Sequence, residues 1–147
     1  MTRARTRTAA AAMIMMLTMF TTSAARRSAA VGGPVLSVSP TSVAFAPTPV
    51  GGFSYEIVTI TNTGDATDFI SSATPVESPF FATFGGTCNF SVDPITGKNY
   101  YIPAGSSCTF QWGFNPSRPG RQTGTGTLNF ESGATLTVSF TGRALPH

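Results

Sequence analysis

The sequence predicts an all-β domain in which about seven or eight strands pack as a β-sandwich. The main observation is the segment Ser106–Pro116, where apolar and mostly polar side chains alternate, so that one face of a strand is apolar. That face carries Cys108, Phe110, Trp112 and Phe114, and we expect Trp112 to be buried in the core. Two further observations agree. The chain has 12 Phe, 15 Gly and 11 Pro, and turn residues recur roughly every 8–12 positions with no amphipathic helix between them.

The first 25 residues have the composition of a secretory signal peptide. A basic start at Met1–Arg7 precedes 12 mostly apolar residues at Ala9–Phe20, and Ser23–Ala25 fits a small-x-small cleavage site. The apolar segment is shorter than the roughly 20 residues that span a bilayer. We therefore expect cleavage after Ala25, with Ala30 as the second choice, and a secreted or periplasmic protein of the cell envelope. An uncleaved anchor is the alternative, since the weakly apolar residues that follow could lengthen the helix.

Charge is divided unevenly along the chain. The net charge is +3, but five arginines lie in the first 27 residues, and the remainder holds four cationic side chains against six carboxylates, a net charge of −2. The basic character therefore belongs to the leader, and it is no argument for nucleic-acid binding. We expect no nucleic-acid partner, and no stable membrane insertion once the leader is removed.

Alternating patterns and turn residues divide the rest of the 147-residue chain, which has room for one domain and a short extension. Residues 26–34 are expected to form a flexible spacer, 35–144 the sandwich and 145–147 a tail. Strands are expected at 35–38, 43–45, 55–62, 69–73, 80–84, 106–116, 123–130 and 136–140, while 89–92 fits either a strand or a loop. Prolines interrupt the first two strands, which suits edge positions because an edge strand tolerates a missing N–H. Asp93–Tyr101 is expected to be a hairpin insertion.

Several short motifs, taken in order, resemble one known group of domains. They are Leu36–Phe45, Val50-Gly51, Val58–Gly64, Ile102–Phe110, Phe114–Pro116, Pro119-Gly120, Gly126–Leu128 and Val138–Gly142. With these motifs the chain resembles the ASPM/SPD-2/Hydin (ASH) type of immunoglobulin-like domain, in the form found in bacterial secreted proteins as a choice-of-anchor D module. The resemblance covers about residues 36–144.

The resemblance implies a seven-stranded immunoglobulin-like sandwich, akin to the major sperm protein and pilus-chaperone folds. It also implies a module that binds or acts as a spacer and carries no catalytic residues. The chain departs from the pattern in two ways: members often occur in tandem, whereas this chain has room for one, and Asp93–Tyr101 is longer than the usual connection. A binding surface particular to this chain would lie in that insertion, at Lys98, Asn99, Tyr100 and Tyr101.

Cys88 and Cys108 are the two cysteines of the chain. In an exported protein they are expected to form a disulfide. Closing a loop of this length stabilises a fold by about 3 kcal/mol when the effect is treated as lost entropy of the unfolded chain. A redox or metal pair is the alternative, and it is disfavoured because two cysteines without a nearby His make a poor metal site.

The polar residues give no pattern that argues for catalysis or metal binding. His147 is the only histidine and the last residue, whereas a Ser-His-Asp site needs its histidine held in a cleft. Ser139 fits the outward face of a Ser/Thr-rich strand. Asp65 and Asp68 flank a turn, and turn formation is expected there because a calcium site needs more oxygen ligands at regular spacing. We therefore expect no enzyme, no metal and no cofactor.

Three functions are compatible with these observations. The first expectation is an exported, non-catalytic module that binds a protein or cell-surface component or supports a surface assembly. A carbohydrate-binding protein would instead use exposed aromatics, with Tyr100, Tyr101, Phe53 and Tyr55 as candidates, although packing at the sandwich rim is expected for these rings. A periplasmic chaperone-like protein would need a long exposed edge strand, which the N-terminal prolines shorten. The partner's identity and the oligomeric state stay open.

Overall fold

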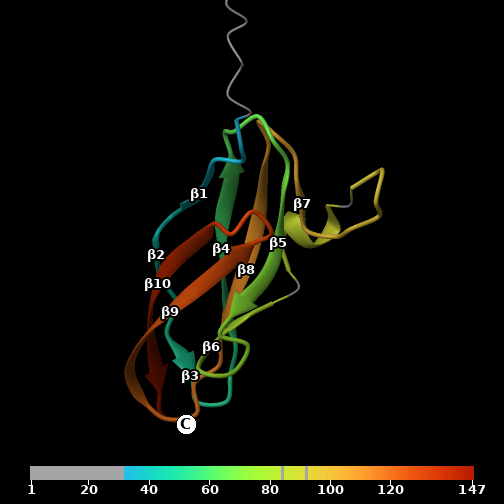
Figure 1. Ribbon diagram of the computed structural model, residues 1–147. Coiled ribbons are helices and arrows are strands. Elements are labelled where there is room, and N and C mark those ends of the chain that lie inside the picture. The colour runs from blue at the N-terminus through green and yellow to red at the C-terminus, as the bar shows by residue number, and fades with distance from the viewer. Residues whose placement is uncertain (1–31, 84, 92) are drawn as a thin grey trace, which may run out of the picture. The chain divides into compact units, whose positions relative to one another are not determined.

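The strands of the computed structural model form two sheets that face each other, and the structure describes residues 32–147 except 84 and 92 (Figure 1). The first sheet has the order β1-β4-β8-β6, with β1 at Leu36–Ser39, β4 at Ser54–Asn62, β8 at Ser107–Phe114 and β6 at Phe80–Ala82. The predicted signal peptide lies outside the described residues.

The second sheet has the order β2-β10-β9-β5-β7, and β3 also pairs with β10. Its strands are β2 at Ser42–Ala44, β3 at Thr48–Pro49, β5 at Asp68–Thr74, β7 at Tyr101–Ile102, β9 at Gly120–Phe130 and β10 at Thr135–Leu145. Within the described part of the chain the one helix is a short 3-10 turn, η1 at Thr87–Phe90, and no helix there is long and apolar enough to cross a membrane. The predicted all-β sandwich is confirmed.

The core lies between the sheets and is built from the alternating faces that the sequence predicts. Trp112 is fully buried at the middle of β8, and its ring centroid lies 5.2 Å from that of Phe110 and 5.0 Å from that of Phe140 on β10. Val58 and Ile60 of β4 are also fully buried. Aromatic pairs at these separations contribute beyond their buried area.

Glycines on the inner face of the second sheet make room for these rings. A Cβ at Gly142 would lie 2.6 Å from the Phe114 ring, and one at Gly126 would collide with both Phe140 and Trp112. The large rings of one sheet therefore rest directly on the backbone of the other. This close approach connects the high Phe content of the chain with its high Gly content.

Several boundaries differ from the sequence prediction. Strand β10 continues to Leu145, because Ala144 is buried and pairs with Thr48 of β3. Residues 89–90 belong to η1, so neither the strand nor the loop expected at 89–92 forms at these two positions, and residue 92 lies outside the described residues. The 93–101 insertion is a loop closed by backbone hydrogen bonds from Asp93 N to the Lys98 carbonyl (2.9 Å) and from Tyr101 N to the Ser91 carbonyl (3.2 Å). Asn99 forms an isolated β-bridge within it, and Tyr101 begins β7.

The edge strands are short, as the prolines predict. β1 has four residues and ends before Pro40, β6 and β2 have three residues each, and β3 has two. Short edges offer few unpaired backbone groups to a partner strand.

Candidate binding surface

The predicted surface at residues 98–101 is attached to the body of the domain. The Nζ of Lys98 lies 3.0 Å from both carboxylate oxygens of Glu131 and 5.2 Å from the centroid of the Phe69 ring. The Tyr101 ring also packs on Phe69, with centroids 5.7 Å apart. Tyr100 and Tyr101 are half-buried, while Lys98 and Asn99 are exposed. These two tyrosines therefore present no open aromatic platform.

Asp93 holds the tip of the same insertion. Its carboxylate accepts a hydrogen bond from the Thr96 hydroxyl and another from the Ile95 backbone N–H (3.0 Å). The Thr96 hydrogen bond, followed by the Ile95 N–H, holds the pKa of this carboxyl below its usual range, because both favour the ionised form. The turn leaves Ile95 92% exposed at the tip.

The other two candidate aromatics lie on the outer face of the first sheet. Phe53 is 60% exposed and Tyr55 50% exposed, so the expectation that they pack at the rim is wrong. Their rings are nearly parallel, at 7° between planes and 6.4 Å between centroids. Ile57, two residues further along β4, is 51% exposed on the same face. The outer face of β4 is therefore apolar where an exposed strand face is usually polar.

A glycine on the neighbouring strand brings a fourth side chain to this face. Gly113 of β8 pairs with Tyr55 on one side and with Phe81 of β6 on the other. Because Gly113 has no side chain, the Phe81 ring lies directly on its backbone, in space that a Cβ would occupy. Phe81 meets Phe53 edge-on, at 86° and 6.4 Å between centroids. We call Phe53, Tyr55, Ile57 and Phe81 the aromatic patch.

A hollow of about 470 Å³ adjoins the aromatic patch. It is lined by Phe53, Val76, Glu77, Ser78, Phe81 and Asn115. Val76 is 70% exposed, and the Ser78 hydroxyl donates to the Asn115 side-chain oxygen at 3.1 Å. The hollow thus combines aromatic walls with hydroxyl, amide and carboxylate groups, which is the usual composition of a site for a polar organic ligand.

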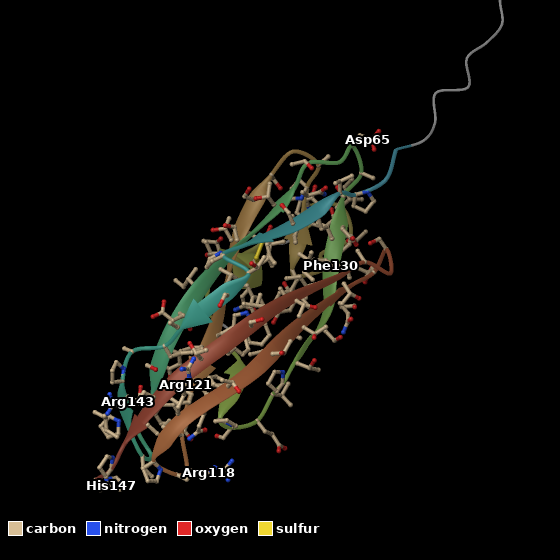
Figure 2. The ribbon with its side chains drawn as sticks, turned by 90° about the vertical axis from the view of Figure 1, so that its left-hand side faces the viewer. Asp65, Arg118, Arg121, Phe130, Arg143 and His147 are labelled. Carbon is tan, nitrogen blue, oxygen red and sulfur yellow. A yellow bond between two sulfur atoms is a disulfide. The ribbon has the colours of Figure 1, made fainter. Side chains whose placement is uncertain are left out.

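The residues considered for catalysis lie apart from one another. Ser139 is exposed on β10, and Figure 2 shows His147 at the end of the sandwich opposite Asp65. Asp68 is buried, and it accepts hydrogen bonds from the Phe69 N–H (2.8 Å) and from the N–H and hydroxyl of Ser132. It therefore fastens β5 to the turn between β9 and β10. No cluster of three or more metal-binding side chains occurs in the described ranges.

Cys88 and Cys108 form the predicted disulfide, with their Cα atoms 4.9 Å apart. Both cysteines are buried. The bond, drawn in yellow in Figure 2, joins η1 to β8. It anchors the segment that leads into the 93–101 insertion, so its role in this structure is to hold a long connection against the core strand.

Comparison with known proteins identifies the fold. No protein-family model and no curated protein matches the sequence. The solved structures that resemble it include a protein of unknown function from Porphyromonas gingivalis W83 (12% identity, TM-score 0.55, 78% of this chain and 48% of that one), the VesB protease of Vibrio cholerae (14%, 0.54, 74% and 31%) and the ASH/PapD-like domain 7 of human CEP192 (14%, 0.52, 76% and 86%). The chain thus spans about a third of VesB. At these identities the likeness shows the fold alone, an immunoglobulin-like sandwich.

Two members of the aromatic patch were outside the sequence prediction. Ile57 could have been found, since Tyr55, Ile57 and the inward Val58 make β4 apolar on both faces. Phe81 gives no such signal, because its place beside Phe53 depends on how β6 and β4 both pair with β8.

Proposed function

We propose that this chain is an exported, non-catalytic immunoglobulin-like module of the ASH type, which binds a component of the cell surface through the aromatic patch. The observation that carries the proposal is the exposure of three large apolar side chains, Phe53, Tyr55 and Ile57, side by side on one outer sheet face. Contiguous exposed apolar surface on a soluble domain usually marks an interaction site.

The aromatic patch is not needed to complete the core. The inner face of β4 already buries Val58 and Ile60, and the sandwich closes over Trp112 without help from the outer face. Removing the exposed rings should therefore change binding much more than folding. The contacts between the rings also favour binding, because side chains that already pack against each other lose little conformational freedom when a ligand docks.

A carbohydrate ligand is a second candidate, and the geometry of two rings favours it. Phe53 and Tyr55 are exposed and nearly parallel, at 7° between planes. The adjoining hollow supplies the Glu77 carboxylate, the Ser78 hydroxyl and the Asn115 amide, which can hydrogen-bond to sugar hydroxyl groups. The half-buried Tyr100 and Tyr101 do not support this function.

Capture from the cell envelope with matched variants tests the binding proposal. The protein is immobilised and exposed to its own envelope fraction, alongside the double variant Phe53→Ser/Tyr55→Ser and the control Ile95→Ser. The control removes an even more exposed apolar side chain that lies far along the sequence from the patch. Components retained by the wild type and by Ile95→Ser, but lost from the double variant, would support the proposal. Equal retention by all three proteins would refute it.

A glycan array separates the two ligand classes. The same three proteins are applied to an array of bacterial polysaccharide fragments, and retained envelope material is treated with protease. Saturable glycan binding that the double variant loses would assign a carbohydrate ligand. Protease-sensitive capture with no glycan binding would assign a protein.

Export is tested on the product itself. The basic start, the 12-residue apolar segment and the small-residue site predict loss of the leader. N-terminal sequencing of protein recovered outside the cytoplasm should begin near Arg26 or Val31. A product that keeps Met1 and remains in the cytoplasm would contradict export.

A further inference from the structure

Two arginines are directly paired on the outer face of the second sheet. Arg121 of β9 lies opposite Arg143 of β10, and both side chains are exposed. Directly opposite residues of an antiparallel pair share a face and have Cβ atoms about 4.5–5.5 Å apart, and like charges in such a pair repel each other. Figure 2 shows both residues, together with Arg118, at the end of the sandwich where His147 lies.

This arginine pair has no counter-ion within the described part of the chain. All six carboxylate side chains of the sequence lie in that part, yet its one ion pair joins Lys98 to Glu131. Three of the four cationic side chains after residue 27 are therefore gathered at one end of a domain whose own net charge is −2. The summed positive potential of these unpaired guanidinium groups attracts anions to this end.

The pair borders a hollow rather than a flat surface. A space of about 450 Å³ is lined by Phe45, Arg121, Thr141, Gly142 and Arg143. It opens where the N-terminal segment leaves the edge of β10, since β2 ends at Ala44 and β3 begins only at Thr48. Thr141 precedes Arg143 by two residues on the same strand face, so its hydroxyl lies on the side of the two guanidinium groups.

We propose that this hollow binds a tetrahedral oxyanion, a phosphate or sulfate group, between Arg121 and Arg143. Two guanidinium groups carry two positive charges, which one doubly charged anion or two neighbouring phosphodiesters of a polymer neutralise and a single carboxylate does not. Arginine also offers paired N–H donors that match the oxygen edges of such a group, and the Thr141 hydroxyl can donate to a further oxygen. The binding step needs no bond making or breaking.

The proposal is independent of the aromatic patch. The patch lies on β4 and β6 of the first sheet, whereas the arginine pair lies on β9 and β10 of the second. Since the hollow is open to solvent, the oxyanion can be a free ion or a group carried on an anionic polymer. The chemistry at the two arginines is the same in both cases, and the source is an outcome of the test.

NMR titration of the arginine side chains tests the site. Inorganic phosphate is added to the protein at constant ionic strength, maintained with sodium chloride, and the Nε–Hε signals are followed. We expect saturable shifts of Arg121 and Arg143, with affinity about ten-fold weaker or more in Arg121→Gln and in Arg143→Gln, because each removes one charged hydrogen-bonding group. Arg118→Gln is the matched control, since Arg118 does not line the hollow.

Three results would overturn the proposal. One is the absence of saturable shifts at Arg121 and Arg143, and another is an equal effect of chloride. The third is an equal loss of affinity in Arg118→Gln, which would show a diffuse charge effect rather than a site. Thermal unfolding gives a second readout: phosphate should raise the midpoint of the wild type and of Arg118→Gln, and at the same concentration should raise the midpoints of Arg121→Gln and Arg143→Gln less.

Poly(glycerol phosphate) and inorganic sulfate distinguish the sources. Polymer that binds more tightly per phosphate than the free ion, and competes with it at Arg143, assigns the site to a polyanion. Equal affinity per phosphate group assigns it to the free ion. Binding of inorganic sulfate at the same two residues extends the site to other doubly charged tetrahedral oxyanions, and polymer binding that persists unchanged in Arg143→Gln contradicts the site.

Discussion

Replacing Trp112 by Ala and by Phe separates two contributions of this side chain to stability: its packing in the core and its unpaired indole N–H. The side chain is fully buried against Phe110 and Phe140, and its indole N–H has no hydrogen-bond partner in the described structure. A buried unpaired donor is costly, so the tryptophan stabilises the fold through packing and destabilises it through its polar atom. Alanine removes both contributions, whereas phenylalanine keeps most of the packing and removes the N–H.

The expected magnitudes differ enough to be measured. Truncation of a buried Trp to Ala costs about 3–5 kcal/mol, which is a large share of a typical stability of about 5–15 kcal/mol. Replacement by Phe removes about two buried carbons, at about 0.8 kcal/mol each, and leaves a small cavity. It also recovers about 1–3 kcal/mol of desolvation penalty from the unpaired N–H. We therefore expect the free energy of unfolding to change by less than about 1.5 kcal/mol for Trp112→Phe.

Urea unfolding followed by far-UV circular dichroism gives both values, since neither variant keeps the tryptophan fluorescence. The denaturant slope should be the same for the three proteins, which shows that the unfolded states are comparable. In the wild type, iodide should barely quench the fluorescence of Trp112. A loss of about 3 kcal/mol or more in Trp112→Phe would refute the argument about the N–H. A loss below about 1 kcal/mol in Trp112→Ala would refute the placement of this ring in the core.

Three further predictions concern the residues that fasten the loops. Asn62→Asp should lower the free energy of unfolding at pH 7 by about 2 kcal/mol or more, because it places a buried negative charge where two side-chain N–H groups now donate to carbonyl oxygens. Urea unfolding measures this loss, and an unchanged midpoint would contradict the prediction. The double variant Cys88→Ala/Cys108→Ala should lose about 3 kcal/mol by the same assay, and a loss under 1 kcal/mol would contradict a role for the 20-residue loop closure. Asp93 has a lowered pKa, so its ionised form stabilises the turn above the usual aspartate range and the effect is lost as pH falls through the lowered value. Amide exchange at Thr96 should therefore quicken in acid beyond its normal pH dependence, whereas Asp93→Asn should exchange quickly throughout.

The core could be predicted because its information is local. On β8 and β4, residues two positions apart face the same way, so alternation alone places Trp112, Val58 and Ile60 inside. The disulfide was predictable because the chain has two cysteines and its N-terminal sequence predicts an export leader. Prolines mark the edges for a similarly local reason, since each removes one backbone donor.

Asn62 shows where local reasoning falls short. The sequence places it at the end of the expected strand 55–62, but no sequence pattern indicates that its polar side chain is fully buried. Its amide donates to the carbonyls of Ala66 (2.8 Å) and Ile102 (3.2 Å), and its oxygen accepts from the N–H groups of Val35 (3.2 Å) and Gly64 (3.1 Å). Two of these partners, Val35 and Ile102, lie 27 and 40 positions from Asn62 in the sequence and come close to it only in the folded chain. A pattern of single residues does not contain that information.

Both candidate sites depend on the pairing of strands in the same way. Arg121 and Arg143 are 22 positions apart, and they are neighbours only because the β9–β10 register places one opposite the other. A shift of one residue in that register would turn the two side chains to different faces. The composition gives the number of arginines, but only the strand register places two of them at the same hollow.

Strand β8 links the predictable core to the unpredicted patch. Its inward residues, Trp112 and Phe114, are fully buried, and between them the outward position is Gly113, on which the Phe81 ring lies. A larger residue at this position would lift Phe81 away from the sheet and break its edge-on contact with Phe53. Strand β8, which has the strongest core pattern, therefore also determines how close the Phe81 ring lies to the sheet. The buried residues on either side of Gly113 hold β8 in the core, so the fold positions the patch before any ligand binds. Binding at the patch therefore costs little conformational entropy.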